Sequence, residues 1–252
     1  MIVRTLAFGD AGTGSWGVVW APGEAAAVSL AGAPGSAPGI LTAELNRAAD
    51  GQAWRVQGTE TSLVFAPTGA AVRGEAAGGS VSSLDELCVV SGTVRLEGSD
   101  QEITSTGWRT TLEGSFELDR MDSFRQTSAW FEATQGFSLA ALRPRKARGQ
   151  DADLVAAVVL DPEPMPPVAD PRLSTTYDAA GVPARAGLEL WLEEESGDQD
   201  DADRHFPRRA AGESVGTGVD WEVAGFKLRA ALLRWHSRGI DGSGVYLLGQ
   251  RE

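Results

Sequence analysis

Two histidines are the side chains best suited to move a proton near neutral pH, because the imidazole pKa is about 6.5. His205 lies beside an acidic run and is expected at the surface, whereas His236, in the segment RWHSR, is the candidate general acid. The chain contains no G-x-S-x-G motif and no H-x-x-x-H spacing. Neither a serine triad nor a zinc site is therefore indicated.

Two carboxylates close to aromatic residues are further candidate acids. Asp122 precedes Arg125 and Trp130 on one segment, and Glu189 is followed by Trp191 on another. Burial against an indole would raise the pKa of a carboxyl group and let it donate a proton. The alternative is structural, with Glu189 pointing to water and Asp122 capping a turn or pairing with Arg125.

Aromatic side chains are the expected ligand contacts. The chain has eight tryptophans, which can line a pocket as well as fill a core. Of the three ligand-binding candidates Trp108, Trp130 and Trp191, we expect the last two to face a cavity. Tyr177, in the segment TTYD before a turn, is either a ligand contact or an anchor for that turn.

A charged loop, residues 143–153, carries four cations followed by two carboxylates. One interpretation is a solvated loop whose ion pairs add roughly 0–1 kcal/mol each. The other is a cationic rim over a cavity mouth, in which Arg143 and Arg145 offer planar guanidinium groups to a carboxylate or phosphate.

Alternating strands must position these groups. The segments 137–142 and 154–160 predict a hairpin around the charged loop. In the segment 124–131, the side chains of Arg125 and Trp130 fall on opposite faces, and both faces mix polar and apolar residues. This pattern is typical of a barrel whose interior is a pocket.

The rest of the chain reads mostly as short strands between Gly, Pro and Asp turns. The segment 41–49 predicts a helix, and 226–235 predicts a strand with a hairpin partner at 242–248, joined through Asp241 and Gly242. We place a division between an N-terminal half, 1–84, and a C-terminal half, 85–252, with an acidic insertion at 193–203.

Composition excludes several classes of partner. The net charge is −13 and the isoelectric point about 4.6, which argue against nucleic acid and anionic membranes. No apolar run is long enough to span a bilayer, so a soluble, cytoplasmic protein is expected.

The single cysteine, Cys88, lies in an apolar strand and is expected to be structural. We expect no metal and no cofactor.

Several short motifs resemble the lipocalin-like double-barrel superfamily, which contains the carotenoid hydratases (hydroxyneurosporene synthases) and related natural-product cyclases. They are GTVRL at 92–96, GWR at 107–109, the Asp122–Arg125–Trp130 strand and GIDGSGVY at 239–246. The resemblance covers roughly 86–252. It implies two calycin-type barrels enclosing a pocket for an apolar or polyketide-like molecule. The chain departs from the pattern in its short N-terminal part and in lacking a matching catalytic signature.

The expected fold is therefore all-β and antiparallel, either a lipocalin-like double barrel or a paired barrel and sandwich. The leading function is binding of an apolar small molecule, with a cofactor-independent hydratase, cyclase or isomerase activity if the protein is an enzyme. One alternative is a β-sandwich that binds or hydrolyses carbohydrate, which predicts two carboxylates about 5–10 Å apart in a groove. Another is a structural or interaction protein without catalysis.

Overall fold

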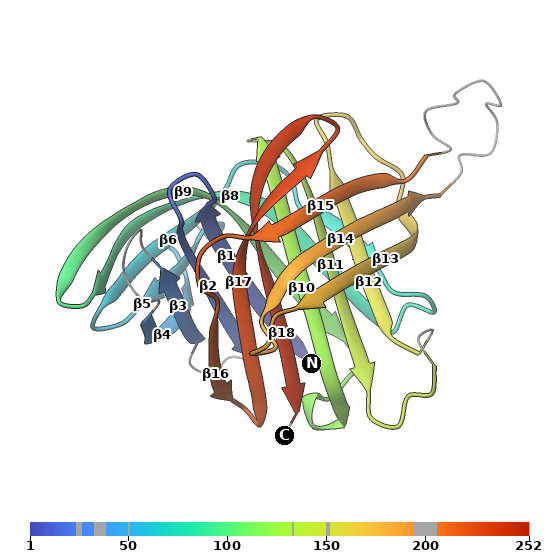
Figure 1. The fold of residues 1–252 in the computed structure, drawn as a ribbon, viewed down its shortest axis with the longest axis horizontal. Helices are drawn as coiled ribbons and strands as arrows, with labels where there is room; N and C mark the ends of the chain where they lie inside the picture. Colours follow the sequence, from blue (N-terminus) through green and yellow to red (C-terminus); the bar gives the residue numbers. More distant parts are fainter. Residues whose placement is uncertain are drawn as a thin grey trace.

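A computed structural model describes residues 1–23, 27–32, 39–49, 51–132, 134–149, 152–193 and 206–251. His205 and the residues 194–203 of the expected acidic insertion lie outside this range. The described residues form two antiparallel sheets, coloured blue to green and green to red in Figure 1. Their only helix is the 3-10 turn η1 (Leu118–Arg120).

The first sheet closes on itself. Its strands are β1 (Ile2–Asp10), β2 (Ser15–Pro22), β3 (Ala27–Gly32), β4 (Gly39–Arg47), β5 (Trp54–Gln57), β6 (Thr61–Pro67), β7 (Val72–Glu75), β8 (Val81–Leu96) and β9 (Ser99–Gly114). They follow the order β6-β5-β4-β3-β2-β1-β9-β8-β7, and an additional pairing of β6 with β8 completes the ring. We call this ring the first barrel.

The second sheet curls into a barrel that stays open along one seam. Its strands are β10 (Met121–Glu132), β11 (Gln135–Pro144), β12 (Leu154–Leu160), β13 (Val168–Tyr177), β14 (Pro183–Leu192), β15 (Arg208–Ser214), β16 (Val219–Val223), β17 (Phe226–Ser237) and β18 (Ile240–Arg251). Their order is β12-β11-β10-β18-β17-β15-β14-β13, with β16 beside β17. The edge strands β12 and β13 form no ladder in the described part of the chain. We call this sheet the second barrel.

The fold confirms the all-β expectation and corrects three details. The segment expected to be helical forms β4, where Leu41 and Ala43 are buried and Thr42 and Glu44 exposed, a period of two. The expected division at residue 84 falls inside β8, because β8 and β9 form one long hairpin of the first sheet. The change of sheet comes instead between Gly114 and Met121.

The third correction concerns a turn. The predicted hairpin of β17 and β18 is present, but its turn is Arg238–Gly239, because Ser237 already pairs with Ile240. Both turn residues have positive φ, 49° and 82°. Two-residue hairpins need this geometry to match the twist of the strands, and glycine adopts it without strain.

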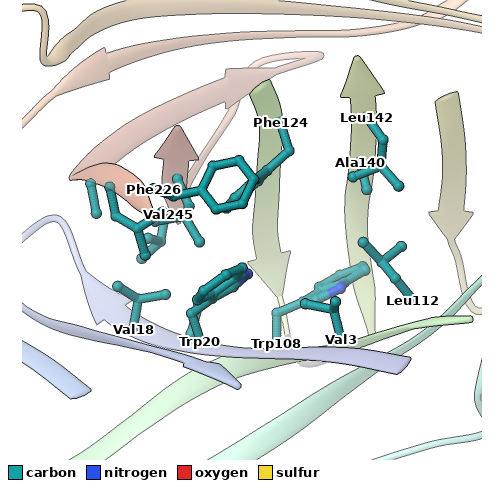
Figure 2. Packing of buried hydrophobic residues seen from close by; sticks show 14 of the residues in the cluster. Val3, Val18, Trp20, Trp108, Leu112, Phe124, Ala140, Leu142, Phe226 and Val245 are labelled. Carbon is teal, nitrogen blue, oxygen red and sulfur yellow. The ribbon is translucent and has the colours of Figure 1, made fainter. Parts of the chain in front are cut away.

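Apolar side chains form three layers. One cluster lies inside each barrel, and a third joins the barrels. Figure 2 shows Trp20 of the first barrel pointing toward Phe124 and Phe226 of the second. Trp20 stacks on Phe124 with a centroid separation of 5.3 Å, and Phe226 meets Phe124 edge-on at 5.5 Å. This aromatic contact fixes the two barrels against each other.

Candidate functional site

A cavity of about 1240 Å³ opens at one end of the second barrel. Its walls come from β10, β11, β12, β13 and β18, and the turn after β7 lies at its edge. Apolar side chains make up much of the inner wall, namely Leu139, Ala141, Val155, Leu173 and Leu248.

Small side chains are more frequent inside the second barrel. Of the fifteen buried residues that the structure describes in its interior cluster, six are alanine, against two of fifteen in the first barrel, and one of the six, Ala141, lines the cavity. Bulkier residues such as Trp54 and Phe65 fill the first barrel. Cavities form where the side chains facing inward are too small to meet across the interior.

The open seam lies beside the cavity. Leu154 and Val155 of β12 face residues 168–173 of β13 across it, and all of these line the cavity. The connection between the two strands, DPEPMPP at 161–167, contains four prolines. Proline has no backbone N–H to give to a ladder. The cavity therefore lies against the place where the sheet is not closed by hydrogen bonds.

A carboxylate bridges two arginines at the cavity. Asp153 accepts a hydrogen bond from Arg125 Nη2 at its Oδ2 and one from Arg143 Nη1 at its Oδ1, both of 2.9 Å. The Asp153 side chain is only 9% exposed, whereas the two arginine side chains are about one-third exposed. Arg143 thus lies at the cavity and pairs within the charged loop, while Arg145 is exposed and outside the cavity lining.

Hydroxyl groups occupy the interior next to this cluster. The Tyr246 hydroxyl lies 2.8 Å from Thr175 Oγ1, and Tyr177 neighbours it at the cavity wall. Burial, followed by the proximity of Tyr177, raises the pKa of Tyr246 above its ordinary value. Tyr246 therefore stays a neutral phenol in the physiological range.

The structure brings Arg125, Arg143 and Tyr177 together around the cavity. It places Trp108 and Trp130 elsewhere, in the packed layer between the barrels. Trp130 is 4% exposed and its Nε1 donates to the Gly9 carbonyl at 3.3 Å. The expectation that Trp130 faces a cavity is wrong, because this face of β10 packs on the first barrel.

Trp191 and Glu189 lie on the outer face of β14. Their neighbours Leu188 and Leu190 point into the barrel, so alternation directs both candidates outward. Glu189 Oε1 accepts hydrogen bonds from Arg209 Nη2 at 2.5 Å and Nε at 2.9 Å. The expectation that Trp191 faces the cavity is therefore wrong. Glu189 points away from the barrel interior, as its structural alternative expected.

His236 and Asp122 also lie away from the cavity. His236 is on the outer face of β17, where its Nδ1 is 2.9 Å from Asp241 Oδ1. Together with Glu189 it borders a shallow depression of about 690 Å³ on the outside of the barrel. Asp122 is exposed at the start of β10, and Arg125 pairs with Asp153 instead.

A buried carboxyl group was missed by the sequence analysis. Asp85 of β8 is 0% exposed and accepts hydrogen bonds from Trp108 Nε1 at 2.8 Å and Thr110 Oγ1 at 2.6 Å. Its other oxygen, Oδ2, has no hydrogen-bond partner among the described residues. Burial raises the pKa of Asp85, and the hydrogen bonds oppose that rise. Its polar position between Ser83 and Leu87 in an otherwise apolar strand face was the available signal.

The described residues contain no group of three or more His, Cys, Asp and Glu side chains that could hold a metal ion. Among them there is also no helix with the length and apolarity needed to cross a membrane.

Comparison by sequence finds no relative, since no protein-family model and no curated protein matches the chain. Comparison by structure finds several. CghA, solved with Sch210972, superposes with a TM-score of 0.66 at 10% identity, covering 100% of this chain and 89% of CghA. A putative AttH from Nitrosomonas europaea gives 0.63 at 13% identity, covering 98% and 91%.

Kievitone hydratase from Nectria haematococca gives a TM-score of 0.60 at 11% identity, covering 99% of this chain and 88% of that enzyme. All three are lipocalin-like double-barrel proteins. The alignments span nearly the whole chain, so both barrels take part in the likeness. The protein therefore has the lipocalin-like double-barrel fold.

Proposed function

We propose that this protein binds an apolar small molecule inside its second barrel. The observation that supports this function is the cavity of about 1240 Å³, whose wall combines aliphatic side chains with polar and charged ones. Ligand pockets in proteins are typically about 300–1,000 Å³ and mostly apolar, with a few polar groups that orient the ligand. Arg125, Arg143 and Tyr177 are the polar groups in this position.

Burial of the ligand would supply most of the affinity. Apolar surface removed from water contributes roughly 25 cal/mol per Å². Leu139 of β11, Val155 of β12 and Leu248 of β18 offer that surface, and the seam between β12 and β13 borders it.

A second candidate is hydration, cyclisation or isomerisation of the bound molecule without a cofactor. It is favoured by the shared fold of kievitone hydratase and by the Tyr177 hydroxyl at the cavity wall. Both oxygens of Asp153 already accept hydrogen bonds, one from Arg125 and one from Arg143. Incubation with a library of unsaturated natural products should then give a mass gain of one water, and Tyr177→Phe should abolish it.

The binding function is tested with the neutral fluorescent probe N-phenyl-naphthylamine (NPN). We expect saturable binding to the wild-type protein and weaker binding to Ala141→Leu, whose added atoms occupy the cavity. The matched control Ala211→Leu alters an exposed position on the outer depression and should bind as the wild type does. Absence of saturable binding, or equal weakening in both variants, would refute the site.

A further inference from the structure

Among the described residues, the Asp153 cluster holds more positive than negative charge. Its single carboxylate pairs with two guanidinium groups, Arg125 and Arg143, at 2.9 Å each. Arginine keeps its positive charge at all physiological pH values. Two positive charges therefore meet one negative charge, and the cluster has one positive charge left over.

Arg125 can offer this charge to a ligand. It projects from the inner face of β10 into the cavity, and among the described residues its Nε and Nη1 have no protein acceptor. Arg109 of the first barrel shows the contrasting state. Its guanidinium is 5% exposed and donates to Glu86 and to the carbonyl oxygens of Gln52 and Phe65. Arg109 is saturated by protein acceptors, whereas Arg125 keeps donors that face the cavity.

Other carboxylates at the cavity lie farther toward solvent. Glu75 pairs with Arg73 at 3.0 Å and Asp170 with Arg172 at 2.6 Å, and all four side chains are at least half exposed. Glu193 is exposed. Water screens charges in such positions far more than it screens the cluster around the buried Asp153. The part of the cavity wall around Asp153 is therefore its electropositive part.

We propose that the ligand is an apolar acid, whose carboxylate or enolate oxygen binds Arg125 and Arg143 while its hydrocarbon part lies against Leu139 and Val155. This inference rests on the proposed binding function and adds the chemical class of the ligand. Guanidinium groups bind such oxygens through charge-assisted, often bidentate hydrogen bonds. The acid would supply the second negative charge that the cluster lacks.

The test compares two probes of similar shape, the anionic anilinonaphthalene sulfonate (ANS) and the neutral NPN. Arg125→Gln should weaken ANS binding about tenfold or more, and Arg143→Gln should act in the same direction. Asp153→Asn should strengthen ANS binding, because it frees both arginines. NPN affinity should change less than about twofold in all three, since apolar burial dominates it.

Arg95→Gln serves as the control, because Arg95 is an exposed arginine paired with Asp100 outside the cavity. It should change neither probe, and near-UV circular dichroism should show each variant folded. Parallel changes of ANS and NPN, or an unchanged ANS affinity in both arginine variants, would overturn the acid-binding inference alone. If the wild type binds neither probe, the proposed binding function fails with it.

Discussion

The first barrel is closed by the pairing of β6 with β8 and filled by residues such as Phe8 and Phe65, whereas the second is open between β12 and β13 and has more alanine in its interior cluster. The interior arginines follow the same division, with Arg109 saturated by protein acceptors and Arg125 facing a cavity. The two halves of the molecule thus share one architecture, but the first barrel has a packed interior and the second encloses a cavity. The size of the inward side chains, more than the strand order, separates the two roles.

The largest contrast is expected from truncating matched leucines. Leu63 is buried inside the first barrel, and Leu139 is equally buried in the second but borders the cavity. Leu63→Ala should lower the free energy of unfolding toward the upper end of roughly 2–5 kcal/mol, because it leaves a sealed void. Leu139→Ala should lower the free energy of unfolding by an amount near the lower end of that range. Urea unfolding measures both, and equal losses would show that the second barrel is packed as tightly as the first.

Enlarging matched alanines should give the opposite contrast. Ala43→Leu would overpack the first barrel and cost about 1–3 kcal/mol. Ala141→Leu points into the cavity and should cost less, while weakening NPN binding. A larger stability loss for Ala141→Leu in thermal or urea unfolding would mean that the cavity is not accessible space.

The interface between the barrels should respond to pH through Asp85. The pKa of Asp85 in the native state lies above the unfolded value of about 3.9. At a pH between these two pKa values, the native state therefore binds more protons than the unfolded state does. This contribution to stability is complete below the unfolded pKa and is lost as pH rises through the native pKa. Asp85→Asn removes that loss and should raise the free energy of unfolding near pH 8. The check is urea unfolding across pH, and an unchanged slope in the variant would exclude Asp85 as its source.

The smallest effect is expected outside the barrels. Arg209 is 68% exposed and pairs with Glu189 on the outer face of β14. Arg209→Gln should change the free energy of unfolding by about 0–1 kcal/mol and leave NPN binding unchanged. Weaker NPN binding in this variant would move the ligand from the cavity to the outer depression.

Much of the fold could be predicted from the alternation of apolar and polar residues and from the turns. The same alternation predicted one feature of the site. The opposite faces of Arg125 and Trp130 follow from a period of two, which the structure confirms. The sequence did not indicate which face of β10 points into the second barrel. Both faces of β10 are buried, one by its own barrel and one by the first barrel, so burial patterns alone do not distinguish them.

The role of Asp153 was still harder to predict from the sequence. Its partner Arg125 is on β10, which is separated from β12 by β11, and the pairing depends on the register of these strands. Asp122, nearer in sequence to Arg125, was the obvious partner, but it lies at a register shift of β10 between Met121 and Ser123 and is exposed. Local spacing identifies strand neighbours and leaves such long-range pairs undetermined.

The most direct test is a crystal structure of the protein soaked with bromonaphthoic acid, an apolar acid whose bromine is located by anomalous scattering. We predict one bromine peak against Leu139 and Val155 in the second barrel, with the carboxylate at Arg125. A peak inside the first barrel, in the outer depression beside His236 or between the barrels, with an empty second barrel, would contradict the central claim.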